Sequence, residues 1–288
     1  MNWKQLISAK RFGMEEFHEE RQENRSEFQR DYDRLIFSAP FRRLQNKTQV
    51  FPLPGSVFVH NRLTHSLEVA SVGRSLGDDV AKALLERHPE LQDSFLPEIG
   101  SIVSAACLAH DLGNPPFGHS GEKAISTFFS EGKGVRLKEK QPNGEQLSPM
   151  EWEDLIHFEG NANAFRILTH QFEGRRKGGF VLTYTTLASI VKYPFSSSLA
   201  GTKSKFGFFV SEEESFRKIA TELGLILLNE HPLKYARHPL VYLVEAADDI
   251  CYQMMDIEDA YKLKILTTEE TKELLMAYFS EERQEHLR

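Results

Sequence analysis

Hydrophobic positions recur with helical spacing along nearly the whole chain, and no two-residue alternation is long enough to predict the core of a sheet. After His65, for example, Leu76, Val80 and Leu84 repeat every four residues. Residues 102–108 are apolar on all sides, which is typical of a helix buried in the centre of a domain. The pattern therefore predicts an all-α protein with this segment in its core.

Breaks in the pattern predict where these helices end and begin. Proline cannot continue a helix, so the Gly-Asn-Pro-Pro run at residues 113–116 should end the apolar one. A further helix should begin near Ser120, a favourable N-cap, and should bury Ile125, Phe128 and Phe129. Residues 131–150 are polar and rich in turn formers, so we expect an inserted mobile loop there, and residues 196–207 predict a second loop.

A long helix is predicted from Pro239 onward, with an apolar stripe and, roughly opposite, an acidic one. The first stripe comprises Leu243, Ala247, Ile250 and Met254, and the second comprises Asp248, Tyr252 and Asp256. Taken alone, the acidic stripe fits a solvated face better than a binding site. From Thr267 a capping box opens a charged helix with no glycine or proline stop, so we expect the natural sequence to continue past residue 288.

Length and composition narrow the class of protein. The chain has 288 residues, of which 40% are hydrophobic, and its polar stretch at 131–150 looks like an insertion rather than a linker, so we expect one domain over residues 1–288. No apolar run approaches the roughly 20 residues that span a bilayer, and residues 1–13 lack a signal-peptide stretch, which predicts a cytoplasmic protein without membrane contact.

Cys107 and Cys251 are expected to be packing residues. The net charge of -7 argues against a general nucleic-acid surface but allows a local basic pocket.

Candidate metal ligands lie on three predicted helices. His110 and Asp111 are adjacent at the end of the apolar helix, where a bend lets both side chains reach one ion, although the helix dipole favours a histidine there without any metal. His65 has Arg62 one turn ahead of it, and Asp248 supplies an acidic group on the late helix. Two imidazoles and two carboxylates would suit Mn, Fe, Ni, Co or Zn better than Ca.

With these residues in the order H…HD…D, the sequence resembles the HD superfamily of metal-dependent phosphohydrolases. Further motifs resemble the deoxynucleoside triphosphate triphosphohydrolases, the dGTPase-like branch, and follow the family order: DYDR at 31–34, FRRLQNKTQVF at 41–51, NRLTHS at 61–66, HDLGNPPFGHSGE at 110–122, FEGN at 158–161, LTYTTLASIVKYP at 182–194 and EAADDICYQMMDIEDA at 245–260. The resemblance implies a helical HD fold whose central helices hold one divalent ion, Mn, Mg, Fe, Ni, Co or Zn, through His65, His110, Asp111 and Asp248.

The resemblance also implies roles for other motif residues. His119 and Glu122, one helical turn apart, match the family's catalytic pair, which orients the attacking water and exchanges protons near the leaving 5′-oxygen. Taken alone, the two could instead cap and stabilise the start of a helix. Polyphosphate contacts are implied at Arg62, Lys192 and Tyr193. Contacts to the deoxyribose are implied at Gln49, Tyr252 and Asp256.

The implied reaction is hydrolysis of a deoxynucleoside triphosphate to the deoxynucleoside and inorganic tripolyphosphate. Two alternatives stay open: another HD phosphohydrolase, such as a nucleotidase or phosphodiesterase, and a non-catalytic protein that binds nucleotides or single-stranded nucleic acid. From the family we also expect a homo-oligomer, an activating nucleotide, weak single-strand binding and a C-terminal region beyond these residues. Because His119 and Glu122 are both present, the sequence argues against the non-catalytic binding protein.

Overall fold

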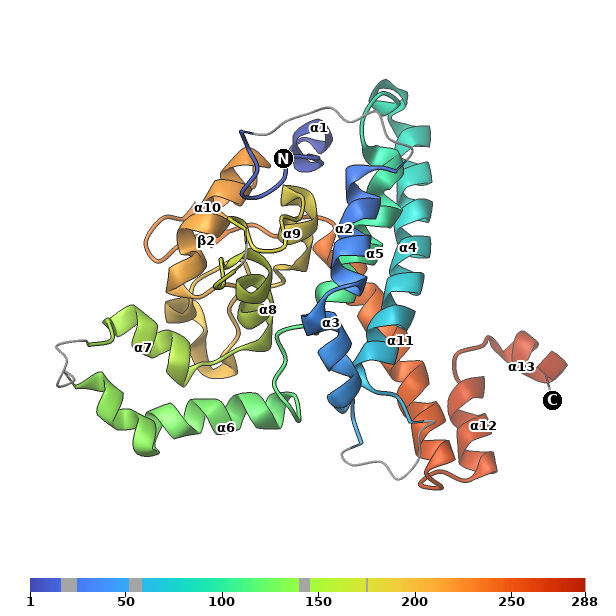
Figure 1. The fold of residues 1–288 in the computed structure, drawn as a ribbon. Coiled ribbons are helices and arrows are strands. Elements are labelled where there is room, and N and C mark those ends of the chain that lie inside the picture. The colour runs from blue at the N-terminus through green and yellow to red at the C-terminus, as the bar shows by residue number, and fades with distance from the viewer. Residues whose placement is uncertain (17–24, 52–58, 140–145, 175, 288) are drawn as a thin grey trace.

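The computed structural model describes residues 1–16, 25–51, 59–139, 146–174 and 176–287, and it confirms the predicted all-α class (Figure 1). Its α-helices are α1 (Trp3–Leu6), α2 (Glu27–Ile36), α3 (Ala39–Arg43), α4 (Arg62–Arg87), α5 (Ile99–Ala109), α6 (His119–Ser130), α7 (Pro149–Ile156), α8 (Gly160–Thr169), α9 (Tyr184–Ile190), α10 (Glu213–Glu222), α11 (Val241–Lys262), α12 (Thr268–Met276) and α13 (Glu281–Leu287). Within these ranges the strands β1 (Leu227–Asn229) and β2 (Lys234–Tyr235) form a small antiparallel hairpin.

Helix α5 lies at the centre of the molecule, and every one of its residues is buried, as its apolar sequence predicts. Helix α4 packs along it through small residues. A Cβ added at Gly77 would lie 2.7 Å from the Cα of Gly100, and one added at Gly73 would lie 2.6 Å from the sulfur of Cys107. The four-residue repeat that includes Leu76 is only partly buried, because the closest approach of the two helices uses the glycines beside it.

Helix α5 ends at Ala109, just before the predicted Gly-Asn-Pro-Pro stop, so its last turn opens into the bend that carries the His-Asp pair. The prediction for the next helix is wrong in its details. Its N-cap is Gly118, and Ser120 lies inside the first turn. Phe128 is exposed and only Glu122 is buried, because α6 packs mainly against α7 and the 3₁₀ helix η4 (Lys133–Lys138) at the edge of the molecule (Figure 1).

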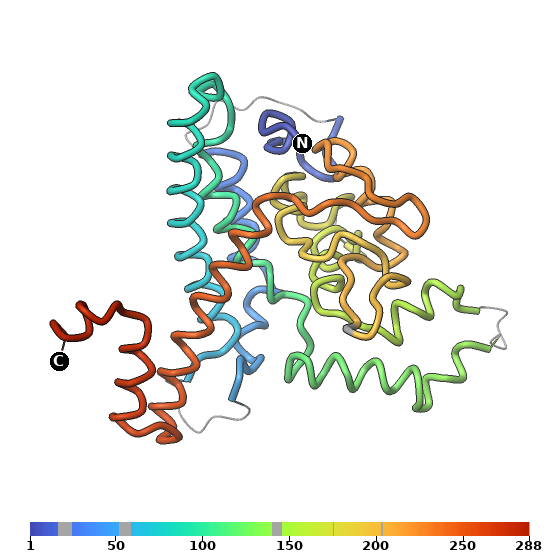
Figure 2. Tube along the Cα trace, turned by 180° about the vertical axis from the view of Figure 1, so that it is seen from behind, coloured from blue at the N-terminus to red at the C-terminus, as the bar shows by residue number. Residues whose placement is uncertain are grey.

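The long helix predicted from Pro239 is α11, and the predicted apolar stripe is right only in its first half, where Ala247 is buried and Leu243 packs against the core. Its buried positions include Val244, Cys251 and Met255, whereas Ile250 and Met254 are 47% and 44% exposed. Helix α11 crosses α4 and α5 obliquely and also contacts α9, so its tertiary neighbours, and not the sequence stripe, determine which side is covered (Figure 2).

The two predicted loops contain more structure than expected. Residues 133–138 form η4 and α7 begins at Pro149, while residues 140–145 of the predicted insertion lie outside the described part of the chain. In the second loop, η5 (Ser197–Leu199) and η6 (Gly201–Lys203) are short 3₁₀ helices. Phe206 is fully buried against Ala162 and Phe209 in a small satellite core, which fixes this segment beside the main body.

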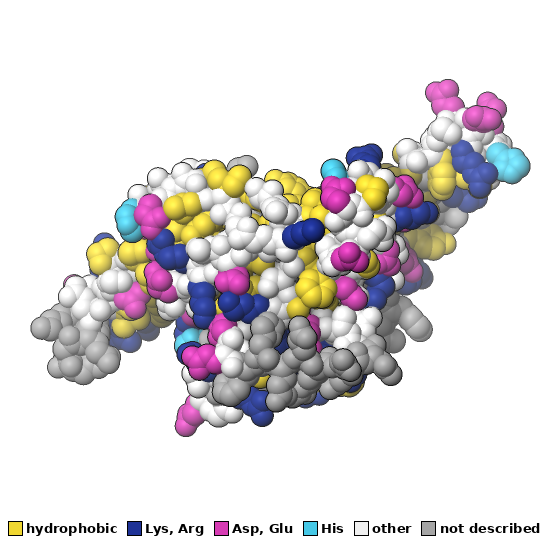
Figure 3. All heavy atoms as spheres, turned by 90° about the horizontal axis from the view of Figure 1, so that it is seen from above, with side chains coloured by type: hydrophobic (Ala, Val, Ile, Leu, Met, Phe, Trp, Pro, Cys, Tyr) yellow, Lys and Arg dark blue, Asp and Glu magenta, His cyan; other side chains and the backbone are white. Residues whose placement is uncertain are grey.

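The C-terminal helices α12 and α13 project from the body at the far end of α11 (Figure 2). The capping box predicted at Thr267 is present, with Glu270 as its partner. Cys107 and Cys251 are both free and buried, as expected of packing residues. Among the described residues, no helix combines the length and apolar character that crossing a membrane requires. On the face seen from above, side chains of both charges are interspersed (Figure 3).

Candidate active site

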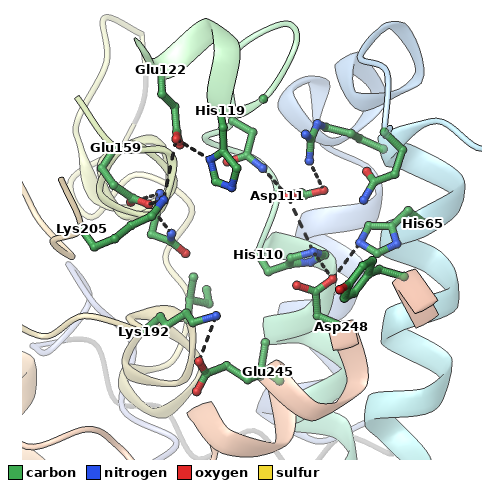
Figure 4. Close-up of a pocket in the computed structure, with 18 of the residues that line it drawn as sticks. His65, His110, Asp111, His119, Glu122, Glu159, Lys192, Lys205, Glu245 and Asp248 are labelled. Carbon is green, nitrogen blue, oxygen red and sulfur yellow. Dashed lines mark hydrogen bonds and ion pairs between the residues drawn. The ribbon is translucent and has the colours of Figure 1, made fainter. Parts of the chain in front are cut away.

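A cavity of about 420 Å³ opens between α4, α5 and α11 on one side and α6, α9 and the 192–205 segment on the other (Figure 4). Its size falls within the usual range for small-molecule sites. All of the site residues predicted from the sequence line it: Gln49, Arg62, His65, His110, Asp111, His119, Glu122, Lys192, Tyr193, Asp248, Tyr252 and Asp256.

Local sequence signals bring the four predicted metal ligands to one end of this cavity. Asn61 caps α4 in a reciprocal capping box with Thr64, which makes Arg62 the first residue of the helix and places His65 on the same first turn. His110 and Asp111 follow the last turn of α5, and Asp248 comes from the second turn of α11.

The four side chains approach one another closely. His65 Nε2 lies 3.0 Å from Asp248 Oδ1, and His110 Nε2 lies 3.5 Å from the same oxygen and 3.7 Å from Asp111 Oδ1. The other ring nitrogen of His110 is 2.6 Å from the carbonyl oxygen of Cys107. If Nδ1 donates to that carbonyl, Nε2 directs a lone pair at the two carboxylates.

This donor set fits a metal ion. Ligand atoms around a cation at about 2.1 Å lie roughly 3 to 3.5 Å apart, close to the separations above. His110 Nε2 is buried and has no hydrogen bond within the described part of the chain. A lone pair that faces two carboxylate oxygens is stable only if a cation or a proton lies between them. The ligand atoms of His65, His110 and Asp111 lie close enough together to share one ion, and Asp248 adjoins this group through its contacts to the two histidines.

The charges of the cluster shift its protonation. Burial works to lower the pKa of His110, but the carboxylates of Asp111 and Asp248 outweigh it and raise the pKa to about 9. Burial works to raise the pKa of Asp111 and of Asp248, but His110 holds both below their usual values, helped by Arg62 for Asp111 and by His65 for Asp248. The protein alone thus keeps both carboxylates ionised, as a metal site requires.

Arg62 reaches the cavity next to this cluster. Its guanidinium is buried and donates from Nη1 to Asp111 Oδ2 at 2.6 Å, while its Nε has no hydrogen bond within the described residues. Gly118, at φ +53°, makes room for it, since a Cβ there would lie 2.6 Å from Nη2. The same glycine is the N-cap of α6, so the turn that starts α6 also accommodates the arginine.

His119 and Glu122 face the cluster from α6. His119 Nδ1 lies 2.7 Å from Glu122 Oε2, and the other carboxylate oxygen of Glu122 accepts from the backbone N–H of Gly160 at 2.8 Å. The Glu122 side chain is nearly buried, whereas 83% of the His119 side chain is exposed. This arrangement leaves Nε2 of His119 open to the cavity side of α6 (Figure 4).

Lys192 comes from the end of α9 and pairs with Glu245 of α11 at 2.9 Å. Burial works against its charge, but Glu245 raises its pKa, so the lysine stays protonated. Glu245 also accepts from Arg237 at 2.8 Å, and Arg237 stacks against Tyr193. The predicted pair of Lys192 and Tyr193 is therefore part of a larger charged network along one side of the cavity.

Several cavity residues were not predicted from the sequence. They are Asn114, Glu159, Asn161, Lys205 and Glu245. Four of them lie inside motifs that were quoted for the resemblance, so position within a motif was the signal that could have found them. Lys205 lies in a segment interpreted as a loop and had no such signal.

A comparison with protein families gives the class. Residues 62–176 match the HD domain family, and this stretch contains His65, His110 and Asp111 together with α4, α5 and α6. This part of the chain is therefore similar to an HD domain, in agreement with its helical architecture.

Individual relatives narrow the class. The chain is 46% identical over 284 residues to a protein of Pseudomonas aeruginosa (strain LESB58) named deoxyguanosinetriphosphate triphosphohydrolase-like protein. The aligned region covers 96% of this chain and 61% of the relative. A protein of Synechocystis sp. with the same name is 45% identical over 275 residues, or 92% and 61% of the two chains. The deoxyguanosinetriphosphate triphosphohydrolase of Yersinia enterocolitica is 36% identical over 304 residues, or 94% and 57%.

These relatives confirm the resemblance to the dGTPase-like branch of the HD superfamily. The chain spans about three fifths of their length.

Proposed function

We propose that this chain forms the active site of a metal-dependent deoxynucleoside triphosphate triphosphohydrolase. The observation that carries the proposal is that one cavity holds a His/Asp cluster, three cationic side chains and a His–Glu pair. In the proposed reaction, the oxygen of a water molecule bonds to the α-phosphorus and the bond from this phosphorus to the 5′-oxygen breaks. The products are the deoxynucleoside and tripolyphosphate.

The metal would be held by His65, His110, Asp111 and Asp248. When bound, a divalent ion of this kind acts as a Lewis acid and stabilises charge on the phosphoryl oxygens. Arg62 is placed to contact a phosphate on the cluster side of the cavity, and its planar fork suits two oxygens at once. Lys192 and Lys205 line the cavity and would neutralise further phosphate oxygens.

His119 would deliver a proton to the departing 5′-oxygen from its Nε2. Glu122 supports this role because its carboxylate accepts from Nδ1 and so orients the ring.

Three side chains would contact the deoxyribose: Gln49, Tyr252 and Asp256. The Oε1 of Gln49 is buried and has no hydrogen bond within the described residues, so it is available to accept from a 3′-hydroxyl. Asp256 lines the cavity beside Tyr252 and offers carboxylate oxygens to a sugar hydroxyl.

We also propose a cytoplasmic, homo-oligomeric protein. An activating nucleotide and weak single-strand binding stay predictions from the family resemblance. On the surface seen from above, neither charge dominates, so single-strand binding would depend on another face or on the cavity itself (Figure 3).

Product analysis tests the proposal. The full-length protein would be incubated with Mn²⁺ and each deoxynucleoside triphosphate in turn, and the products separated by anion-exchange chromatography. We expect equal amounts of deoxynucleoside and tripolyphosphate. Release of orthophosphate or of a monophosphate would indicate a different HD phosphohydrolase, and tight nucleotide binding without products would indicate a non-catalytic protein.

A further inference from the structure

Glu159 is a fully buried carboxylate at the edge of the cavity, and the proposed function gives it no role so far. It is the N-cap of α8 and accepts from the backbone N–H groups of Asn161 and Ala162 at 2.5 and 3.3 Å. The side-chain amide of Asn161 also donates to it, at 2.7 Å. Its remaining partner is Lys205, whose Nζ lies 2.8 Å from Glu159 Oε1 (Figure 4).

Lys205 lies between two carboxylates. Its ammonium is bonded to Glu159, and it is 3.7 Å from Glu122 Oε2, too far for a hydrogen bond. That same oxygen is the one that accepts from His119 Nδ1. The other oxygen of Glu122 is occupied by the backbone N–H of Gly160.

We infer that Glu159 is a positioning residue for the proposed His119–Glu122 pair: by binding Lys205, it keeps the ammonium from competing with His119 for Glu122 Oε2. The inference rests on the proposed function for its effect on turnover. If Glu159 carried no charge, Glu122 would be the remaining carboxylate in reach, and a movement of about 1 Å would bring Lys205 within hydrogen-bond distance of it. The imidazole of His119 would then share Glu122 Oε2 with the ammonium, and a Glu122 drawn toward Lys205 would orient the ring less well.

The backbone beside Glu159 supports this geometry. A Cβ at Gly160 would lie 2.1 Å from Asn114 Oδ1 and 2.8 Å from Glu122 Oε1, so a larger residue there would push both side chains away from their present positions. The FEGN motif therefore fixes Glu122 twice, through the backbone of Gly160 and through the partner that Glu159 provides for Lys205.

A double-mutant cycle tests the inference, using Glu159→Gln, Lys205→Met and both together. Glutamine keeps the oxygen that caps α8 but removes the charge that holds Lys205. Two readouts are taken on each protein: the imidazole ¹⁵N shifts of His119 at pH 8, assigned with His119→Gln, and kcat for dGTP with Mn²⁺.

We expect Glu159→Gln alone to shift the Nδ1 signal of His119 and to lower kcat by about ten- to a hundredfold, the usual range for a misplaced catalytic group. With Lys205→Met already present, Glu159→Gln should leave the shift unchanged and alter kcat less than about twofold, because the competitor is gone. An equal effect in both backgrounds, or an unchanged His119 signal in Glu159→Gln, would overturn the inference and leave Glu159 as a helix cap.

Glu212→Gln is the matched control, since Glu212 is also a buried carboxylate, is paired with Arg166, and does not line the cavity. It should lower the melting temperature without moving the His119 signal or kcat. If Lys205→Met does not fold, Lys205→Leu, which also has no donor, replaces it in the cycle. If the wild-type chain shows no turnover, the proposed function fails, and the NMR arm alone decides the role of Glu159.

Discussion

The two sides of the cavity hold their side chains by different means. On the α4–α5–α11 side, His65 is 1% exposed and stands on a helix packed against the fully buried α5. On the α6 side, the His119 side chain is 83% exposed and has one hydrogen-bond partner, Glu122, within the described residues. The first side is thus fixed by close packing of helices, and the second by a chain of polar contacts that can rearrange.

In the proposed reaction, the packed side would bind the metal and the polar side would transfer protons. A metal site needs its ligand atoms fixed within a few tenths of an ångström, which packed helices supply. A proton-transfer residue has to meet substrate and water, so it is placed where solvent and ligand can reach it. Substitutions on the two sides should therefore have separable effects on metal binding and on turnover.

The largest effect is expected on the packed side. Asp111→Ala removes one proposed metal ligand and the partner of Arg62, so it should abolish measurable turnover, a loss of more than about 10⁴-fold. Titration calorimetry with Mn²⁺ should show no binding, while circular dichroism stays helical. Asp249→Ala, at the exposed neighbour of Asp248, is the control and should bind Mn²⁺ as the wild type does. Unchanged Mn²⁺ affinity in Asp111→Ala would contradict the proposed ligand set.

The next largest effect is expected at the proposed sugar site. A site that hydrogen-bonds a hydroxyl rejects an analogue without it by about 10⁴. We therefore expect 2′,3′-dideoxy-GTP to lose about this factor in kcat/KM, because Gln49 Oε1 would have no donor to accept from. Gln49→Ala should show a comparable loss with dGTP, because the 3′-hydroxyl would have no acceptor. A loss of less than tenfold in both measurements would remove Gln49 from the sugar site.

On the polar side, His119→Ala and Glu122→Ala should each lower kcat by about 10² to 10⁴, the usual range for general acid–base groups. Both variants should bind Mn²⁺ normally, because neither residue belongs to the proposed ligand set. Pre-steady-state and steady-state rates with dGTP would measure the effect. Losses below tenfold in both would reduce the pair to the helix-capping role that the sequence alone allowed.

A smaller effect is expected from the packing that supports the ligands. Gly77→Ala puts a Cβ 2.7 Å from the Cα of Gly100, so α4 and α5 must separate, at a cost of about 1–3 kcal/mol in the free energy of unfolding. Urea denaturation measures this cost, and Mn²⁺ affinity should fall with it. Ser75→Ala, on the exposed side of the same helix, is the control and should change neither. Full stability in Gly77→Ala would show that the packing is looser than the structure indicates.

The sequence predicted the contents of the cavity better than it predicted the packing. The start of α4 and the end of α5 depend on local signals, the capping box at Asn61 and the proline stop after Asp111, so the placement of His65 and His110 could be expected. Which residues of α11 are buried depends on the helices that pack against it. The hydrophobic pattern does not contain this information, so the prediction that Ile250 is buried was wrong.

The polar contacts between residues far apart in the sequence could not be predicted either. Glu159 and Lys205 are 46 residues apart in the chain, and Glu122 and Gly160 are 38 apart, so no helical or strand spacing relates them. Lys205 lies in a polar segment whose order comes from the buried Phe206, a contact that exists only in the folded chain.

The most direct test of the central claim is hydrolysis of dGTP in ¹⁸O-labelled water, with the products analysed by mass spectrometry. We expect one labelled oxygen in the tripolyphosphate and none in the deoxyguanosine, because water attacks the α-phosphorus and the 5′-oxygen leaves. Label in the deoxyguanosine, or in released orthophosphate, would contradict it.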